Sequence, residues 1–147
     1  MSTRKKANVD DSPPCYILDS YALLAYLEGE QGPNKIKALL VEASREACHL
    51  YMSWINLGEV LYITERERGL PQAHAVLAIV EQLPIHLIEA SSRVVLDAAH
   101  IKAHYPVSFA DAFAIAVAQK QNGVIVTGDP EFETVEEIIT IQWLKKY

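Results

Sequence analysis

The chain alternates between two kinds of segment, and this alternation is what most constrains its fold. Short runs of β-branched and aromatic residues are separated by longer segments whose apolar residues recur at helical spacing. The runs cover residues 15–18, 49–53, 85–88, 123–127 and 140–144. Parallel strands need long crossover connections, and strands this apolar are typical of a sheet covered on both faces. We therefore predict a parallel α/β sheet in a single domain.

The segments between these runs carry signals for helix ends. Gly69 closes one helical pattern, Pro71 stands at the start of the next, and Pro106 stops a third. We expect helices within residues 20–29, 34–47, 55–69, 71–83, 91–105 and 108–119. Helices therefore separate the first four predicted strands from one another.

Length and composition limit the class of protein. With 147 residues, half of them hydrophobic, the chain can bury one core but not two. Cys15 and Cys48 do not form a CxxC pair, so we expect buried, reduced thiols in a cytoplasmic protein rather than a disulfide framework. No stretch approaches the roughly 20 apolar residues of a membrane span, so we expect a soluble protein without a membrane partner.

The first residues differ in composition from the rest of the chain. Residues 1–14 are mostly polar, include the basic group Arg4, Lys5 and Lys6, and end in two adjacent prolines. A segment that buries so little apolar surface has nothing to offset the entropy lost on ordering. We therefore expect a flexible leader over residues 1–14 and the folded domain over residues 15–147.

Four acidic residues follow strands or begin helices. Asp19 comes directly after the first run, and Asp129 comes shortly after the fourth. Asp111 lies in the first turn of its helix, and Glu59 lies early in the helix after the second run. Because the loops leaving the carboxyl ends of parallel strands converge at one edge, we predict all four acids at that edge.

Each acid taken singly has a structural explanation as well. Ser108 and Asp111 have the spacing of a capping box, and Asp19 and Asp129 stand where helix N-caps are expected. Glu59 lies past the best capping positions and among apolar neighbours, so its carboxylate needs a partner.

Taken together, the four acids favour a metal site. Carboxylates gathered at one edge repel one another unless a cation lies among them, and no Lys or Arg lies within the four motifs. Oxygen ligands without His or Cys select a hard ion such as Mg²⁺ or Mn²⁺. Such an ion leaves room for a phosphate oxygen and a water, as metal-assisted phosphodiester hydrolysis requires. A formal charge of −6 argues against nucleic-acid binding only if the acids are spread over the surface.

The motifs around these acids resemble those of a known family. They are LDSYALLAYL with Asp19, WINLGEVLY with Glu59, SFADAFAIA with Asp111 and VTGDPEF with Asp129. In this order they resemble the four acidic motifs of PIN-domain ribonucleases, most closely the VapC-type toxins of toxin–antitoxin pairs. The resemblance covers residues 16–132 and implies a five-stranded parallel sheet with helices on both faces.

The resemblance also implies an activity and a site. The expected activity is endonucleolytic cleavage of RNA with Mg²⁺ or Mn²⁺, leaving a 5′-phosphate. Asp19 and Asp111 would be the principal metal ligands, and Glu59 and Asp129 would complete the pocket directly or through water. Ser20 and Thr127 match the small hydroxyl residues that border such sites.

Two protein partners follow from the same resemblance. A cognate antitoxin is expected to lay an apolar helix in a groove and to place an Arg or Lys in the acidic pocket. We expect that groove to be lined by Tyr21, Leu24, Tyr26 and Leu61. A homodimer is also expected.

Two other classes of protein remain as alternatives. A phosphorelay receiver also gathers aspartates on a parallel sheet, but it needs an acidic pair after the first strand and a lysine after the last, which this chain lacks. A catalytically degenerate PIN-fold interaction module is the second alternative, and the four intact acids count against it.

Other residues that could carry chemistry have simpler explanations. His100 and His104 have zinc-binding spacing on one helix but no third ligand nearby, so we expect a surface helix there. Trp54, Trp143 and the seven tyrosines could stack on bases, but most of them stand at apolar periodic positions, and for those we expect packing in the core.

Overall fold

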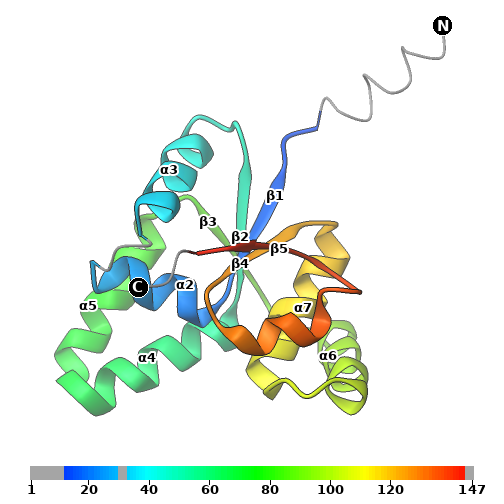
Figure 1. Ribbon diagram of the computed structural model, residues 1–147. Helices are drawn as coiled ribbons and strands as arrows, with labels where there is room; N and C mark the ends of the chain where they lie inside the picture. The colour runs from blue at the N-terminus through cyan, green and yellow to red at the C-terminus, as the bar shows by residue number, and fades with distance from the viewer. Residues whose placement is uncertain (1–11, 30–32, 145–147) are drawn as a thin grey trace, which may run out of the picture.

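The computed structural model describes residues 12–29 and 33–144. Its sheet has five strands: β1 (Cys15–Leu18), β2 (His49–Ser53), β3 (Ile85–Ile88), β4 (Val124–Thr127) and β5 (Thr140–Trp143). They lie in the order β3-β2-β1-β4-β5, and every neighbouring pair is parallel (Figure 1). The predicted five-stranded parallel sheet is therefore confirmed.

Helices cover both faces of this sheet, as predicted. They are α2 (Ser20–Leu27), α3 (Pro33–Ser44), α4 (Trp54–Arg68), α5 (Leu70–Gln82), α6 (Ser92–His104) and α7 (Phe109–Gln121), with a 3₁₀ helix η1 (Pro130–Val135) before β5. Figure 1 shows α2 to α5 on one side of the strands and α6 and α7 on the other. No helix of the described ranges is long and apolar enough to cross a bilayer.

Successive strand residues face opposite layers of helices. Ile17 and Ile125 pack in the core cluster that contains α6 and α7, whereas Leu18 and Val126 pack in the cluster that contains α2 and α3. All four side chains are fully buried, and each such burial contributes roughly 1.5–3 kcal/mol. This alternation fixes the register of the central strands and thus the direction in which the chain leaves them.

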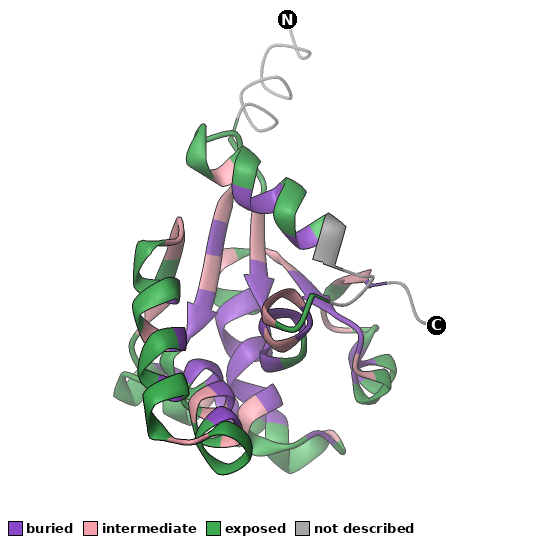
Figure 2. Cartoon of the chain, turned by 90° about the vertical axis from the view of Figure 1, so that its left-hand side faces the viewer, coloured by how far each residue is buried: buried purple, intermediate pink, exposed green. Residues whose placement is uncertain are grey.

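The middle of helix α7 is buried on every side. Eight successive residues, from Asp111 to Ala118, are buried between the sheet and α6 (Figure 2). A helix without a solvent-facing side has no need of a polar face, which explains its almost entirely apolar sequence. Asp111 is the exception, and its place at the start of the helix brings a carboxylate to the edge of the core.

The strand order reverses at the carboxyl edge between β1 and β4, and we call the space outside these two strand ends the crevice. The chain runs outward from β1 through β2 to β3, then crosses to the other side of β1 and continues through β4 to β5. Ligands of open α/β sheets bind where the strand order reverses in this way, here between the ends of β1 and β4. Asp19 and Asp129 follow these two strands.

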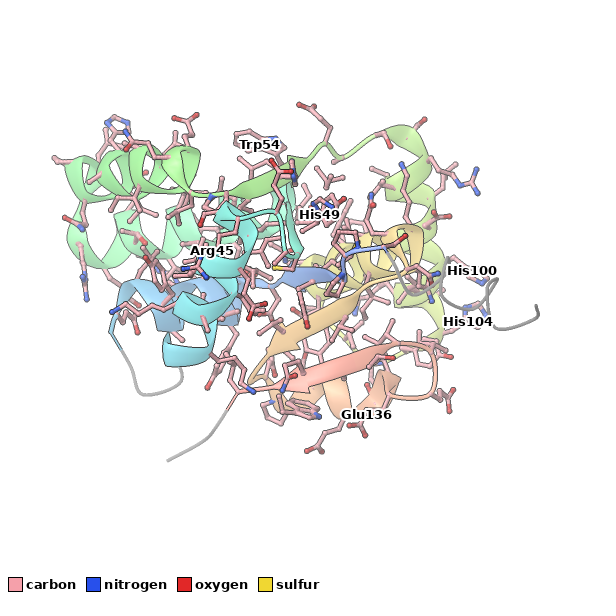
Figure 3. All side chains as sticks on the ribbon, turned by 90° about the horizontal axis from the view of Figure 1, so that it is seen from above. Arg45, His49, Trp54, His100, His104 and Glu136 are labelled. Atoms are coloured by element: carbon pink, nitrogen blue, oxygen red, sulfur yellow. The ribbon has the colours of Figure 1, made fainter. Side chains whose placement is uncertain are left out.

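Most of the described tyrosines pack against the core, as predicted, and Trp143 does so too, whereas Trp54, Tyr21 and Tyr62 lie outside it. Trp54 is 37% exposed (Figure 3), and Tyr62 is 54% exposed. Trp143 is partly buried against the core. The core-facing positions of α4 are taken by Leu57 and Val60, so Trp54 in the first turn and Tyr62 on another face remain outside. Helical periodicity identifies an apolar face but does not say which aromatic residues lie beyond it.

The leader predicted over residues 1–14 falls largely outside the described residues. Pro14 is described, and its carbonyl accepts a hydrogen bond of 2.9 Å from the amide of His49 at the start of β2. The sheet pairing therefore begins one residue before β1. Cys48 is buried and Cys15 is only half-buried, and both are free thiols.

Candidate active site

Asp19 joins the end of β1 to the end of β4. Its Oδ1 accepts a hydrogen bond of 2.8 Å from the amide of Ala22 and so caps α2. Its Oδ2 accepts a hydrogen bond of 2.5 Å from the hydroxyl of Thr127, the buried last residue of β4. Capping and a place in the site are therefore compatible roles for this residue.

Burial gives Asp19 an unusual acidity. Only 1% of the residue is exposed, and this loss of hydration raises the pKa of Asp19 to about 7, with the charge of Asp129 adding to the rise. The hydrogen bonds from Thr127 and Ala22 act in the opposite direction because they stabilise the ionised form. A cation in this crevice would relieve the same penalty.

Asp111 enters the same crevice from the start of α7. The N-cap is Ser108, whose hydroxyl oxygen accepts a hydrogen bond of 3.0 Å from the amide of Asp111. The Asp111 carboxylate interacts electrostatically with Asp19 and Asp129. Burial, a hydrogen bond with the Glu131 carboxyl, and these two charges together raise the pKa of Asp111 to about 8.

Glu131 is a site residue that the sequence analysis missed. Asp111, Asp129 and Glu131 each offer a carboxylate oxygen, and these oxygens lie within 4.8 Å of one another. Asp129 caps η1 by accepting a hydrogen bond of 2.9 Å from the amide of Glu131, which fixes the turn that carries both acids. The Asp129-Pro130 pair signals this helix start in the sequence, and an acid two residues past the cap was the available clue.

Glu59 lies at the side of the crevice rather than within this group of three acids. It is half-buried in α4, and its Oε1 accepts a hydrogen bond of 2.6 Å from the hydroxyl of Ser20. The expected partner of the Glu59 carboxylate is therefore a hydroxyl. Because Ser20 directly follows Asp19, this bond connects Glu59 to the other acids.

Three of the four predicted acids lie close to one another, and the fourth, Glu59, is connected to them through a hydrogen bond. Asp111 and Asp129 lie in one group with Glu131, and Asp19 is in electrostatic contact with both aspartates. Glu59 is linked to Asp19 through the neighbouring residue Ser20.

The donor set fits a hard divalent cation. It consists of carboxylate oxygens, and no Lys or Arg of the described ranges forms an ion pair with them. Two of these acids have raised pKa values because their charges are buried close together, which a bound cation would reverse. Oxygen ligands of this kind suit Mg²⁺ or Mn²⁺.

The two histidines on α6 stand apart from the acidic group. His100 and His104 are exposed, and their ring centroids lie 4.5 Å apart (Figure 3). The Nδ1 atom of His104 is hydrogen-bonded to the carbonyl of His100 at 2.9 Å. The expected surface helix is confirmed, and among the described residues the only metal-competent group of three is the acidic one.

Comparison with known proteins identifies the family. The PIN domain family matches residues 16–138, most of the chain, so the chain belongs to the PIN domain family. No curated protein matches it by sequence.

Solved structures with the same fold include several VapC proteins. VapBC2 from Rickettsia felis, bound to a DNA fragment from its promoter, has a TM-score of 0.70 at 15% identity and covers 89% of this chain and 99% of its own. DNA-bound VapBC from Salmonella typhimurium has a TM-score of 0.68 at 19% identity, with coverages of 88% and 97%. VapC20 from Mycobacterium tuberculosis, a toxin that cleaves the sarcin-ricin loop, has a TM-score of 0.66 at 19% identity, with coverages of 82% and 94%.

Proposed function

We propose that this protein is a metal-dependent endoribonuclease and the toxin of a VapC-type toxin–antitoxin pair. The observation that carries the proposal is the meeting of Asp111, Asp129 and Glu131 beside the buried Asp19, at the carboxyl edge of a PIN-family sheet. Several VapC proteins share this fold, and one of them is described as cleaving an RNA loop.

Asp19, Asp111, Asp129 and Glu131 are the residues that would hold Mg²⁺ or Mn²⁺. When bound, such an ion supplies a Lewis acid for the scissile phosphate and lowers the pKa of a coordinated water. Thr127 fixes one oxygen of Asp19, and the amide of Ala22 fixes the other, so this carboxylate is held in place before any ligand arrives.

Glu59 is the residue proposed to handle the proton. The Ser20 hydroxyl holds its Oε1, which orients Oε2 to accept a hydrogen bond, and then a proton, from an attacking water. Attack by water on the phosphorus would break the bond to the 3′-oxygen, which takes up a proton from solvent, so the products would carry a 5′-phosphate and a 3′-hydroxyl. The sequence preference for RNA depends on loop contacts around the crevice.

An antitoxin is the proposed protein partner. Two of the solved relatives are complexes named VapBC. In this chain a hollow of about 90 Å³ lies between α2, α4 and α5, and its apolar lining includes Leu24, Leu27, Ile63, Val76 and Ile79. This lining suits an amphipathic helix. Of the four residues expected to line a groove, Leu24 is part of it, whereas Tyr21, Tyr26 and Leu61 are not.

Two finer parts of the proposal are a homodimer and a place in the cytoplasm. The homodimer rests on the family resemblance, and the cytoplasm rests on the two free cysteines. Sedimentation of the purified chain tests the first, and fractionation of cells tests the second.

The test is a cleavage assay on total RNA. The purified chain should cut RNA with Mg²⁺ or Mn²⁺ and not with a chelator, and the new 5′ ends should carry phosphate. Asp111→Asn keeps the side-chain volume and removes a charge, so cleavage should nearly vanish. Sequencing of the ends would identify the target. Cleavage that persists in both the chelator and this variant would overturn the proposal.

The degenerate interaction module is distinguished by metal binding. A nuclease site should raise the melting temperature when Mn²⁺ is added, because the ion binds the folded state. A module that kept only the fold should show neither this shift nor cleavage.

A further inference from the structure

Asn56 is a fully buried amide on α4, one helical turn before Glu59. None of its surface is exposed, and its side chain lies against two other helices. Its Nδ2 donates a hydrogen bond of 3.0 Å to the carbonyl of Ala110 in the first turn of α7. It also donates a longer bond of 3.4 Å to the hydroxyl of Ser20 in α2. Both hydrogens of the amide are therefore used.

The two partners of Asn56 are sequence neighbours of the site acids. Ser20 follows Asp19, and its hydroxyl donates to Glu59 at 2.6 Å. Ala110 precedes Asp111. One side chain thus ties together the beginnings of α2, α4 and α7, the three helices that carry Asp19, Glu59 and Asp111.

The orientation of this amide follows from its surroundings. If the amide were reversed, Oδ1 would face the Ala110 carbonyl at about the same separation, and two acceptors would repel each other. The observed orientation leaves Oδ1 buried without a hydrogen-bond partner. A buried carbonyl without a partner lowers stability, and an apolar side chain of similar volume would avoid this. Stability alone therefore does not account for an asparagine here.

We propose that Asn56 is a positioning residue of the metal site. It holds the start of α7, and so Asp111, at a fixed distance from α2, and through the Ser20 hydroxyl it orients Glu59. The inference rests on the proposed nuclease function and assigns to it a residue outside the acidic motifs. Some residues orient metal ligands without binding the ion themselves, and their removal typically lowers metal affinity or activity by roughly 10- to 100-fold.

The test compares Asn56→Leu with the matched control Val80→Ala. Leucine removes the amide, keeps the branched shape and is somewhat larger than asparagine. Val80 is buried in α5, which leads into the amino end of β3, so its truncation weakens the core away from the acidic edge. Mn²⁺ affinity by calorimetry, kcat and KM for RNA, and the melting temperature are measured for the wild type and both variants.

The expected results separate positioning from stability. Asn56→Leu should weaken Mn²⁺ binding by about 10-fold or more and lower kcat by a similar factor, with KM for RNA within about two-fold of the wild type. Val80→Ala should lower the melting temperature and leave Mn²⁺ affinity and kcat unchanged. If Asn56→Leu does not fold, Asn56→Ala serves instead, because a smaller side chain does not force the helices apart.

A double variant tests the path through Ser20. If Asn56 acts on Glu59 through this hydroxyl, the losses in kcat from Asn56→Leu and Ser20→Ala should not add fully. If Asn56→Leu keeps the Mn²⁺ affinity and the kcat of the wild type, the inference about Asn56 is overturned and the proposed function is not. A wild-type chain that neither binds Mn²⁺ nor cleaves RNA would overturn the proposed function, and the inference with it.

Discussion

In the proposed metal site, protons and metal ions would compete for two buried carboxylic acids, Asp19 and Asp111. Burial and neighbouring charges raise both pKa values, to about 7 and about 8, so near neutral pH each acid holds a proton for part of the time. A metal ion must displace these protons. We expect Mn²⁺ affinity to rise as the pH increases through this range, with release of protons on binding.

The same pKa values predict how the metal-free protein responds to pH. An acid whose pKa is raised on folding stabilises the fold fully below its unfolded pKa, about 3.9 for Asp. That stabilisation is lost as pH rises through the folded pKa, because the folded state then has to ionise a buried group. Without metal, the melting temperature should fall between about pH 4 and pH 8, and Mn²⁺ should restore it.

Asp111→Asn should reduce this fall because asparagine cannot ionise. At about pH 8 the metal-free variant should melt at or a few degrees above the wild type, and its Mn²⁺ stabilisation should be lost. Thermal melts across the pH range, in a chelator and in Mn²⁺, measure both effects. A large destabilisation at every pH would instead mean that Asp111 serves the fold as part of the helix cap.

At the scale of single residues, the sequence predicts the location of those acids that stand next to the end of a strand or the start of a helix. Asp19, Asp111 and Asp129 could be placed at one edge because each follows a strand or begins a helix. Asn56 and Glu131 could not, because their importance depends on which groups of other helices or turns they reach. A one-turn spacing to Glu59 does not reveal that Asn56 contacts Ala110, which lies far along the chain.

At the scale of elements, the turn after β4 is shaped by a close contact with α2. Gly128 precedes Asp129, and a Cβ atom there would lie 2.4 Å from Cε1 of Tyr21. Glycine thus permits the Tyr21 ring to pack against the turn that carries Asp129. This contact packs the turn that carries Asp129 directly against the start of α2.

Gly128→Ala should disturb this fit. The Tyr21 ring must move, so we expect a melting temperature a few degrees lower and weaker Mn²⁺ binding as Asp129 shifts. Gly58→Ala is the matched control, because a Cβ atom there meets nothing within 4 Å. In a helix interior this change should stabilise by about 0.5–1 kcal/mol. Unchanged Mn²⁺ affinity in Gly128→Ala would show that the contact does not hold Asp129.

The strands and helices themselves are well predicted from the sequence. The strands begin and end within one residue of the apolar runs, because each run is bounded by a turn or by a helix cap such as Asp19 or Ser53. The exposed side of α4 was not predicted, since burial of Trp54 depends on how α4 sits against its neighbours. Side-chain exposure is a property of packing between elements rather than of either element alone.

At the scale of the whole molecule, the hollow between α2, α4 and α5 is where we expect the proposed antitoxin to bind. Ile79 lines it and is 44% exposed, so a charge there should cost the fold little. Ile79→Glu should keep RNA cleavage and the melting temperature while losing inhibition by the cognate antitoxin. Leu96→Gln, on α6 across the sheet, is the control and should be inhibited as the wild type is. Equal inhibition of both variants would place the antitoxin elsewhere.

The leader gives a second prediction for the whole chain. Deletion of residues 1–12 should leave the melting temperature and the saturating cleavage rate unchanged, because these residues offer little apolar surface and the first sheet hydrogen bond of the described residues is made by Pro14. Arg4, Lys5 and Lys6 can attract RNA at long range in the full chain, so their removal should weaken RNA capture at low salt. Added salt screens this attraction, so the difference between the deleted and the full chain should disappear as salt is raised. Unfolding, or loss of cleavage at saturating RNA, would mean that the folded domain extends into these residues.

The central claim is that the acids at the carboxyl edge bind the ion that supports RNA cleavage. Anomalous diffraction from crystals soaked in Mn²⁺ locates such an ion directly. We predict a peak about 2.1 Å from carboxylate oxygens of both Asp111 and Asp129, next to Asp19 and Glu131, at Mn²⁺ concentrations that support cleavage. A peak at another place, or none at those concentrations, would contradict the account.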